Sequence, residues 1–169
     1  MRSMENKLNN GAPRTMLKKT RIVIALFVCL VYQSASFAQK PNFTGTWVLN
    51  QNKSILESHP EGLTSSIFII KQEGDGFKLT RYHIFGEKKK KISFTMTSDG
   101  KTRSLKLLFN GKLEWKEDTL VASIWRKNFQ NIVNYRFGDS QDQFIADEVY
   151  NGNPKSHHNL WVFDRDKSK

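Results

Sequence analysis

The sequence has a single cysteine among 169 residues and no apolar run longer than about 11 residues. A membrane-spanning helix needs roughly 20 apolar residues, so a multi-span membrane protein is excluded. No internal repeat has the spacing of a propeller or a solenoid. A composition of 38% hydrophobic, 12% aromatic and 25% charged residues excludes a disordered chain, a collagen and a coiled coil. One folded domain is therefore the expectation for a chain of this length.

The first 38 residues have the pattern of a secretory signal peptide. A basic cluster ends at Arg21, an apolar run follows at 22–32, and small residues follow at 34–38. We expect cleavage after residue 38, which leaves residues 39–169 as the domain. The leader directs this domain to the periplasm or to the cell exterior, with no transmembrane segment after processing.

Met16 lies just before the basic cluster, and a start there would leave residues 1–15 outside the protein. The one cysteine, Cys29, lies within the leader and is not preceded by the small residue that a lipidation site requires. Residues 39–169 therefore contain no cysteine, so their stability must come from a packed core rather than from disulfides. The leader holds six of the 27 basic residues and one of the 16 acidic residues, so the net charge falls from +11 to about +6 without it.

From residue 43 onward, apolar and polar residues alternate with a period of two, which is typical of strands with one buried face. Turn residues such as Asp99-Gly100 separate these segments at intervals of about 8 to 12 residues, as in an antiparallel meander. The predicted strands are 43–49, 65–72, 76–85, 92–97, 105–109, 112–116, 119–127, 130–137, 143–150 and 158–164. We predict an all-β, up-and-down antiparallel barrel of about eight to ten strands over residues 42–165, because closure removes exposed strand edges.

The run Phe-Thr-Gly-Thr-Trp-Val-Leu-Asn at 43–50 resembles the Gly-x-Trp first strand of the calycin superfamily, which includes lipocalins, fatty-acid-binding proteins and avidins. With residues 53–54, 99–101 and 113–121, the chain resembles a group of small exported bacterial lipocalin-like domains over nearly all of residues 39–169. The resemblance implies a barrel whose apolar interior holds a small hydrophobic molecule. The Thr-Asp-Tyr motif and disulfide of lipocalins and the Arg-x-Tyr carboxylate clamp of fatty-acid-binding proteins are absent.

Gly45 and Trp47 are interpreted as structural residues. A large ring at one end of a small barrel closes the opening, and a neighbouring glycine lets another segment cross closely. In the superfamily an arginine from late in the chain often stacks on this ring, and the resemblance points to Arg165, with Arg136 as the competing candidate. The expected contact is a cation–π pair.

Polar residues that continue the phase of apolar residues on one strand indicate a binding pocket. Phe77 and Leu79 share one face, and an unbroken phase adds Arg81 and His83 to it. Arg81 would then be an inward cation that binds an anionic head group by a bidentate contact, with His83 as a second donor. A bulge after Thr80 would instead return this arginine to solvent.

Further ligand-binding candidates are the aromatic residues Trp115, Tyr135 and Phe144, at strand positions that could line a cavity. The same residues fit a packed core equally well. The direction of Trp125 is undecided, because both faces of its strand carry apolar residues. A barrel of this size either fills itself or holds one ligand, so both alternatives stay open.

No catalytic motif is present: there is no nucleophile elbow, zinc-binding helix or phosphate-binding glycine loop. His157-His158 are expected to be solvated loop residues rather than metal ligands, because neighbours on a strand point to opposite faces. Asp147-Glu148 are expected to be charges on the solvent face. We expect no enzyme, no cofactor and no metal, with a hydrolase or isomerase around Arg81 and His83 as a third alternative.

The leading hypothesis is an exported, monomeric, non-enzymatic protein that holds a small lipophilic or amphiphilic molecule in its barrel. The alternative is a surface interaction protein with a packed barrel, whose basic loop docks on an anionic partner. That loop consists of Lys88, Lys89, Lys90 and Lys91, and it also fits a solvated hairpin tip. Nucleic-acid binding is not expected, because it requires basic and aromatic residues interleaved over a broad surface.

Overall fold

The computed structural model describes residues 39–105, 108–153 and 155–168, and the predicted leader lies outside them. The long strands are β1 (Gly45–Leu49), β3 (Ser65–Glu73), β4 (Gly76–Phe85), β5 (Lys88–Thr97), β7 (Asn110–Lys116), β8 (Thr119–Arg126), β9 (Phe129–Phe137), β10 (Gln143–Gly152) and β11 (His157–Arg165). Two strands are short, β2 (Ile55–Leu56) and β6 (Arg103–Ser104). Within the described ranges, we find no helix with the length and apolar character needed to cross a bilayer.

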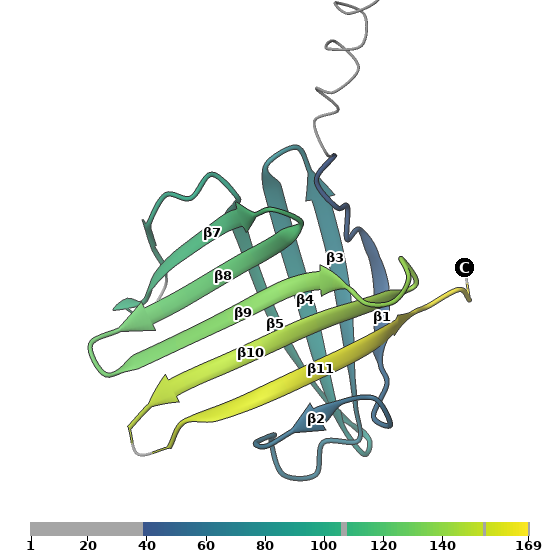
Figure 1. The fold of residues 1–169 in the computed structure, drawn as a ribbon. Helices are drawn as coiled ribbons and strands as arrows, with labels where there is room; N and C mark the ends of the chain where they lie inside the picture. The colour runs from purple at the N-terminus through teal and green to yellow at the C-terminus, as the bar shows by residue number, and fades with distance from the viewer. Residues whose placement is uncertain (1–38, 106–107, 154, 169) are drawn as a thin grey trace, which may run out of the picture. The chain divides into compact units, whose positions relative to one another are not determined.

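Nearly every strand pairs with its neighbour in sequence, and all the pairs are antiparallel. β1 pairs with both β3 and β11, which joins the two ends of the chain in one sheet. The order across the sheet is β5-β4-β3-β1-β11-β10-β9-β8-β7-β6. The sheet curls so that β7 to β11 cross over β1, β3, β4 and β5 (Figure 1). The prediction of an all-β, up-and-down barrel is confirmed.

The barrel is split between β5 and β7. The sheet ends at β5 on one side and at β6 on the other, and among the described residues an isolated bridge from Asp99 to Glu114 crosses the gap. The predicted strand at 105–109 is wrong at its described positions, because β7 pairs instead with the short β6. The Asp99-Gly100 turn therefore does not join two paired strands.

The reason is local to that turn. The Asp99 carboxylate accepts hydrogen bonds of 2.6 and 2.7 Å from Arg103 and one of 3.1 Å from the backbone N–H of Lys101. These contacts close the chain on itself directly after the aspartate. An Asp-Gly pair thus forms a turn here without specifying which strand comes next to β5.

One end of the barrel is filled by aromatic rings that project from the inward faces of the strands. Its largest fully buried side chains include Trp47, Phe43, Phe77, Phe144 and Phe163. The Phe144 ring centroid lies 5.3 Å from that of Trp47 and 5.4 Å from that of Phe43. Stacked and edge-on rings at these separations form a close-packed core. At this end the barrel is packed rather than hollow.

The inward faces of neighbouring strands change from apolar to polar at the same level of the barrel. In chain order along each strand, the inward residues are Phe77, Leu79, Arg81 and His83 on β4; Phe144, Ala146, Glu148 and Tyr150 on β10; and His157, Asn159, Trp161 and Phe163 on β11. The register places Glu148 opposite Asn159. The polar residues therefore gather at the end of the barrel away from the aromatic core.

The lysine run 88–91 is not a hairpin tip. The turn is formed by Gly86-Glu87, and the four lysines begin β5, which is an edge strand. The Lys89 ammonium lies 4.1 Å from the centroid of the Tyr82 ring on the outer face. Lysines along an edge hinder its pairing with another chain, so the fold gives this run a structural role.

Candidate functional site

A polar cavity of about 400 Å³ occupies the end of the barrel where the inward residues become polar. It receives side chains from β4, β9, β10 and β11, and from the connection between β2 and β3. The lining residues are Ser58, His59, Pro60, Arg81, His83, Asn131, Glu148, Tyr150, His157, Asn159 and Trp161. A volume of this size is in the usual range for small-molecule sites.

Arg81 faces this cavity because β4 runs through it without a bulge. The strand pairs residue by residue with β3 and β5 along its whole length, and Arg81 lies opposite Phe68 and Ile92. Its neighbour Tyr82 faces outward against the lysines of β5. Within the described part of the chain, the guanidinium has no hydrogen-bond or ion-pair partner. Its donors are therefore available to an acceptor from outside the protein.

His83 lies next to Arg81 on the same face and is 6% exposed. Burial lowers the pKa of His83 to about 4, and the positive charges of Arg81 and Lys90 act in the same direction. Its buried Nδ1 has no hydrogen-bond partner among the described residues. The imidazole is therefore neutral near pH 7 and can offer either a donor or an acceptor.

Glu148 corrects the expectation of a solvent-facing charge. Its carboxylate accepts hydrogen bonds of 2.8 Å from the Asn131 amide, 2.8 Å from the Trp161 indole N–H and 3.2 Å from the Asn159 amide. Burial alone raises the pKa of Glu148, but these hydrogen bonds and the charge of Arg81 outweigh it and hold the pKa below its ordinary value. The carboxylate is thus ionised, and its oxygens are used within the protein.

His83 should make the stability of the fold depend on pH between about 4 and 6.5. In the unfolded chain its imidazole takes up a proton near pH 6.5, whereas in the folded protein it stays neutral down to about pH 4. The unfolded state binds more protons in this window, so the free energy of unfolding should fall as pH falls, by about 1 kcal/mol for each pH unit. Urea denaturation across this range measures the slope. His83→Gln should flatten it, and an unchanged slope in that variant would contradict the assignment.

The other predicted ligand-binding residues lie away from this cavity. Tyr135 stacks on Phe144 at 5.6 Å within the aromatic core, where burial raises the pKa of its hydroxyl. Phe144 is fully buried, and Trp115 stacks on Phe43 at 5.9 Å. None of the three lines the cavity around Arg81 and His83. Their role as ligand contacts stays a prediction without support from this geometry.

Sequence reasoning missed the residues that β9, β10 and β11 contribute to the cavity. The indication was present, because Glu148 continues the phase of Phe144 on β10 just as Arg81 continues that of Phe77 on β4. The histidine pair is not in a loop, as expected, but begins β11. His157 stacks on Tyr150 at 4.6 Å, while His158 lies 2.6 Å from Asp147. Only the first of these histidines lines the cavity.

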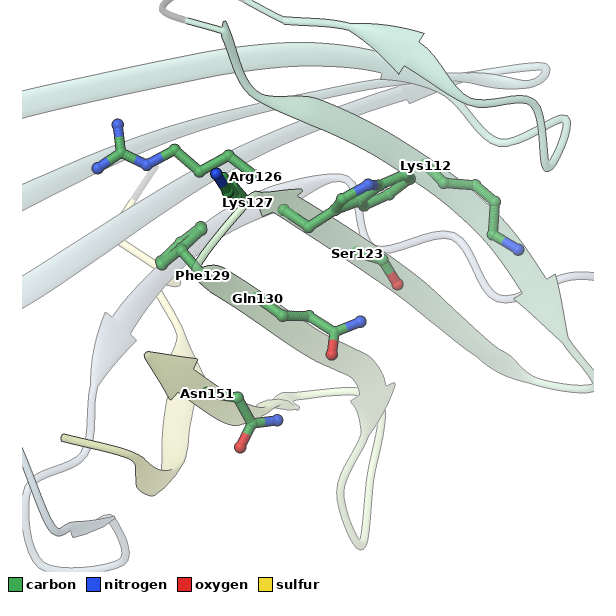
Figure 2. Close-up of a pocket in the computed structure, with 8 residues that line it drawn as sticks. Lys112, Ser123, Arg126, Lys127, Phe129, Gln130 and Asn151 are labelled. Carbon is green, nitrogen blue, oxygen red and sulfur yellow. The ribbon is translucent and has the colours of Figure 1, made fainter. Parts of the chain in front are cut away.

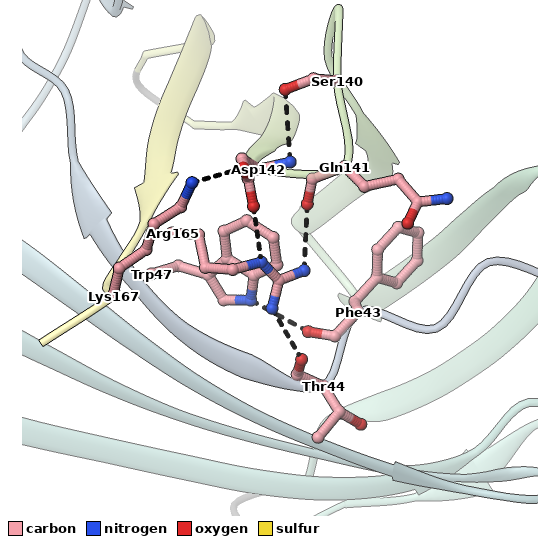
Figure 3. Close-up of polar contacts among 8 residues, drawn as sticks. All are labelled: Phe43, Thr44, Trp47, Ser140, Gln141, Asp142, Arg165 and Lys167. Atoms are coloured by element: carbon pink, nitrogen blue, oxygen red, sulfur yellow. Dashed lines mark hydrogen bonds and ion pairs between the residues drawn. The ribbon is translucent and has the colours of Figure 1, made fainter. Parts of the chain in front are cut away.

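At the packed end, Trp47 and Arg165 form a second polar arrangement (Figure 3). The fully buried Trp47 indole donates a 2.9 Å hydrogen bond to the Phe43 carbonyl, and the Arg165 guanidinium lies 4.1 Å from its ring centroid. Arg165 also donates to the Thr44 carbonyl at 3.2 Å and is 3.3 Å from Asp142. A Cβ at Gly45 would lie 2.6 Å from the Arg165 guanidinium, so a side chain there would displace it. These contacts are structural.

An open groove of about 470 Å³ lies on the outer side of the β8–β9 hairpin (Figure 2). It is lined in part by Trp125, so that indole faces away from the core, and by three cations. Two of these cations already have partners, because Lys112 pairs with Glu114 at 2.8 Å and Arg126 lies 5.0 Å from the centroid of the Phe109 ring. The groove is therefore a weaker candidate than the polar cavity.

Comparison with solved structures places this arrangement among known barrels. A mutant of the fluorescent protein UnaG aligns with a TM-score of 0.50 and 12% identity, covering 75% of this chain and 97% of that one. The fold is that of the calycin β-barrels. Secretory abundant heat soluble protein 4 from Ramazzottius varieornatus has a TM-score of 0.49 and 16% identity over 78% of this chain and 99% of that one. Zebrafish ileal bile acid-binding protein, complexed with cholic acid, has a TM-score of 0.49 and 14% identity over 73% and 98%.

These likenesses concern the fold alone. No protein-family model matches the sequence, and no curated protein matches it. What the site of this calycin-type barrel does must therefore be argued from its own residues.

Proposed function

We propose that this protein is a non-enzymatic binding protein for a small amphiphilic molecule, whose anionic or strongly polar head occupies the cavity at Arg81 and His83. One observation carries the proposal. Arg81 points into the cavity, and its guanidinium has no acceptor among the described residues. Keeping a cation in such a place without a partner is costly, and a bound anionic group removes that cost through charge-assisted hydrogen bonds.

The other polar groups of the cavity support an anion rather than a second cation. His83 is neutral near pH 7, and the Glu148 carboxylate is already occupied by three donors. The remaining unpaired charge is therefore that of Arg81. A head group that accepts two hydrogen bonds matches the geometry of a guanidinium.

The residues do not support a hydrolase or isomerase in the barrel mouth. Ser66 lies opposite His83 across β3 and β4, but the Ser66 hydroxyl and His83 Nδ1 are both buried without a hydrogen-bond partner among the described residues. They do not form the contact that activates a nucleophile. A general base works best with a pKa near the operating pH, and the pKa of His83 is about 4. Binding without catalysis fits these groups better.

Docking of the lysine run on an anionic partner stays a second candidate with less support. Lys88, Lys89, Lys90 and Lys91 are exposed, but they protect an edge strand, and Lys89 and Lys91 lie over Tyr82. Export to the periplasm or the cell exterior is part of the proposal and is based on the pattern of the leader alone.

The proposal is tested by mass spectrometry of the organic extract from the purified domain, residues 39–169. We expect one class of acidic or polar amphiphile in stoichiometric amount, which is absent from a parallel preparation of Arg81→Met. An extract without such a molecule, from a domain that also binds no added amphiphile, would overturn the proposal.

A further inference from the structure

An apolar cleft of about 560 Å³ opens through the barrel wall where β5 and β7 are not paired. Its apolar lining consists of Ile92, Phe94, Leu105, Phe109, Ile124 and Phe129. Ile92 is 37% exposed, although its strand position places it on the inward face of β5. The cleft therefore gives solvent access to apolar interior surface from the side of the barrel rather than from its end.

The cleft adjoins the polar cavity at two places. Ile92 lies directly opposite Arg81 in the β4–β5 pair, and residues opposite each other in such a pair project from the same face about 5 Å apart. On the other side, the Phe129 ring of the cleft lies 5.1 Å from the Tyr150 ring of the cavity. A molecule held at Arg81 thus has apolar surface immediately beside its head.

The opposite direction, along the barrel axis, is closed. Phe77 and Phe144 are fully buried, and Tyr135 lies between them with ring centroids 5.8 and 5.6 Å away. An apolar chain that entered this region from the cavity would have to displace close-packed rings. From Arg81, the open apolar path among the described residues is the one toward Ile92 and the split.

We infer, on the basis of the proposed function, that the apolar part of the ligand lies in the cleft between β5 and β7. The ligand is then a single-chain amphiphile, with its head at Arg81 and its chain across the barrel wall. The chain would cover the apolar surface that the unpaired edges leave exposed. Contiguous apolar surface of this kind usually marks a binding site.

The inference is tested by isothermal titration of the domain with sodium alkanoates from hexanoate to dodecanoate, all below their micelle-forming concentrations. Each additional methylene group that is buried in the cleft should lower the dissociation constant about fourfold. The measured quantity is the slope of log Kd against chain length, because a change in head-group binding shifts all the values without changing the slope.

Ile124 is the position for the variants, because it lines the cleft but not the polar cavity. Ile124→Trp fills the cleft and should weaken dodecanoate binding at least tenfold, with little effect on hexanoate. Ile124→Glu introduces a charge there and should flatten the slope. The matched control is Ser123→Glu, since Ser123 is the preceding residue of β8 and lines the outer groove instead.

The outcomes separate this inference from the proposed function. Arg81→Met should weaken every alkanoate by the same factor and keep the slope. If it does so while both Ile124 variants keep the wild-type slope, the cleft does not hold the chain and the inference is overturned, whereas the proposed function stands. If the wild-type domain binds none of the probes, both fail. A dimer that forms through the split and blocks binding, detected by sedimentation, would also overturn the inference.

Discussion

Arg81→Met should weaken the binding of decanoate about 30- to 150-fold. The substitution removes a charge-assisted contact in a partly desolvated cavity, and such contacts contribute about 2 to 3 kcal/mol. The free energy of unfolding should change little or rise, because the wild-type guanidinium has no acceptor among the described residues and burdens the empty fold. Isothermal titration and urea denaturation measure the two quantities on the same preparations.

The matched control for this variant is Lys78→Met. Lys78 lies on the same strand as Arg81 but is exposed on the outer face. It should leave the affinity within about twofold of wild type, because a surface charge at a distance is screened by salt. Equal losses in the two variants, abolished at high salt, would attribute the effect to long-range electrostatics and contradict a direct contact at Arg81.

Trp47→Ala should lower the free energy of unfolding by about 3 to 5 kcal/mol, the range measured for large aromatic residues replaced by alanine in a core. Trp47 is fully buried, contacts Phe144 and Phe137, and carries the guanidinium of Arg165 against its ring. Its loss also leaves the Phe43 carbonyl without its 2.9 Å hydrogen bond. Guanidinium chloride denaturation followed by circular dichroism measures the change.

Trp125→Ala is the comparison for that measurement. Trp125 is half-buried on the outer side of β8, where its indole lines the open groove. Its removal leaves no closed cavity, so the cost should stay below about 1 kcal/mol. A loss at Trp47 no larger than the loss at Trp125 would show that the aromatic end does not hold the barrel together.

Much of the fold could be predicted because the relevant physics is local. A period of two requires only that alternate residues of a strand face the core, and turn residues mark the ends of each segment. The same rule placed Arg81 and His83 on the inward face with Phe77, and the register of β4 with both its neighbours shows that the phase is unbroken. The strand after Asp99-Gly100 was missed, since the turn sequence does not specify the partner of the strand that follows it.

The sequence by itself determined the all-β class, the meander and the inward direction of Arg81. Only the tertiary structure decided that the barrel is filled at one end, polar at the other and split between β5 and β7. These features depend on which rings and polar groups from distant strands meet at one level. Glu148 shows the difference: its neighbours in sequence are those of a surface charge, but it lies inward because Asn131, Asn159 and Trp161 converge on it from two other strands. A buried carboxylate is stable only with such partners, and a single strand cannot supply them.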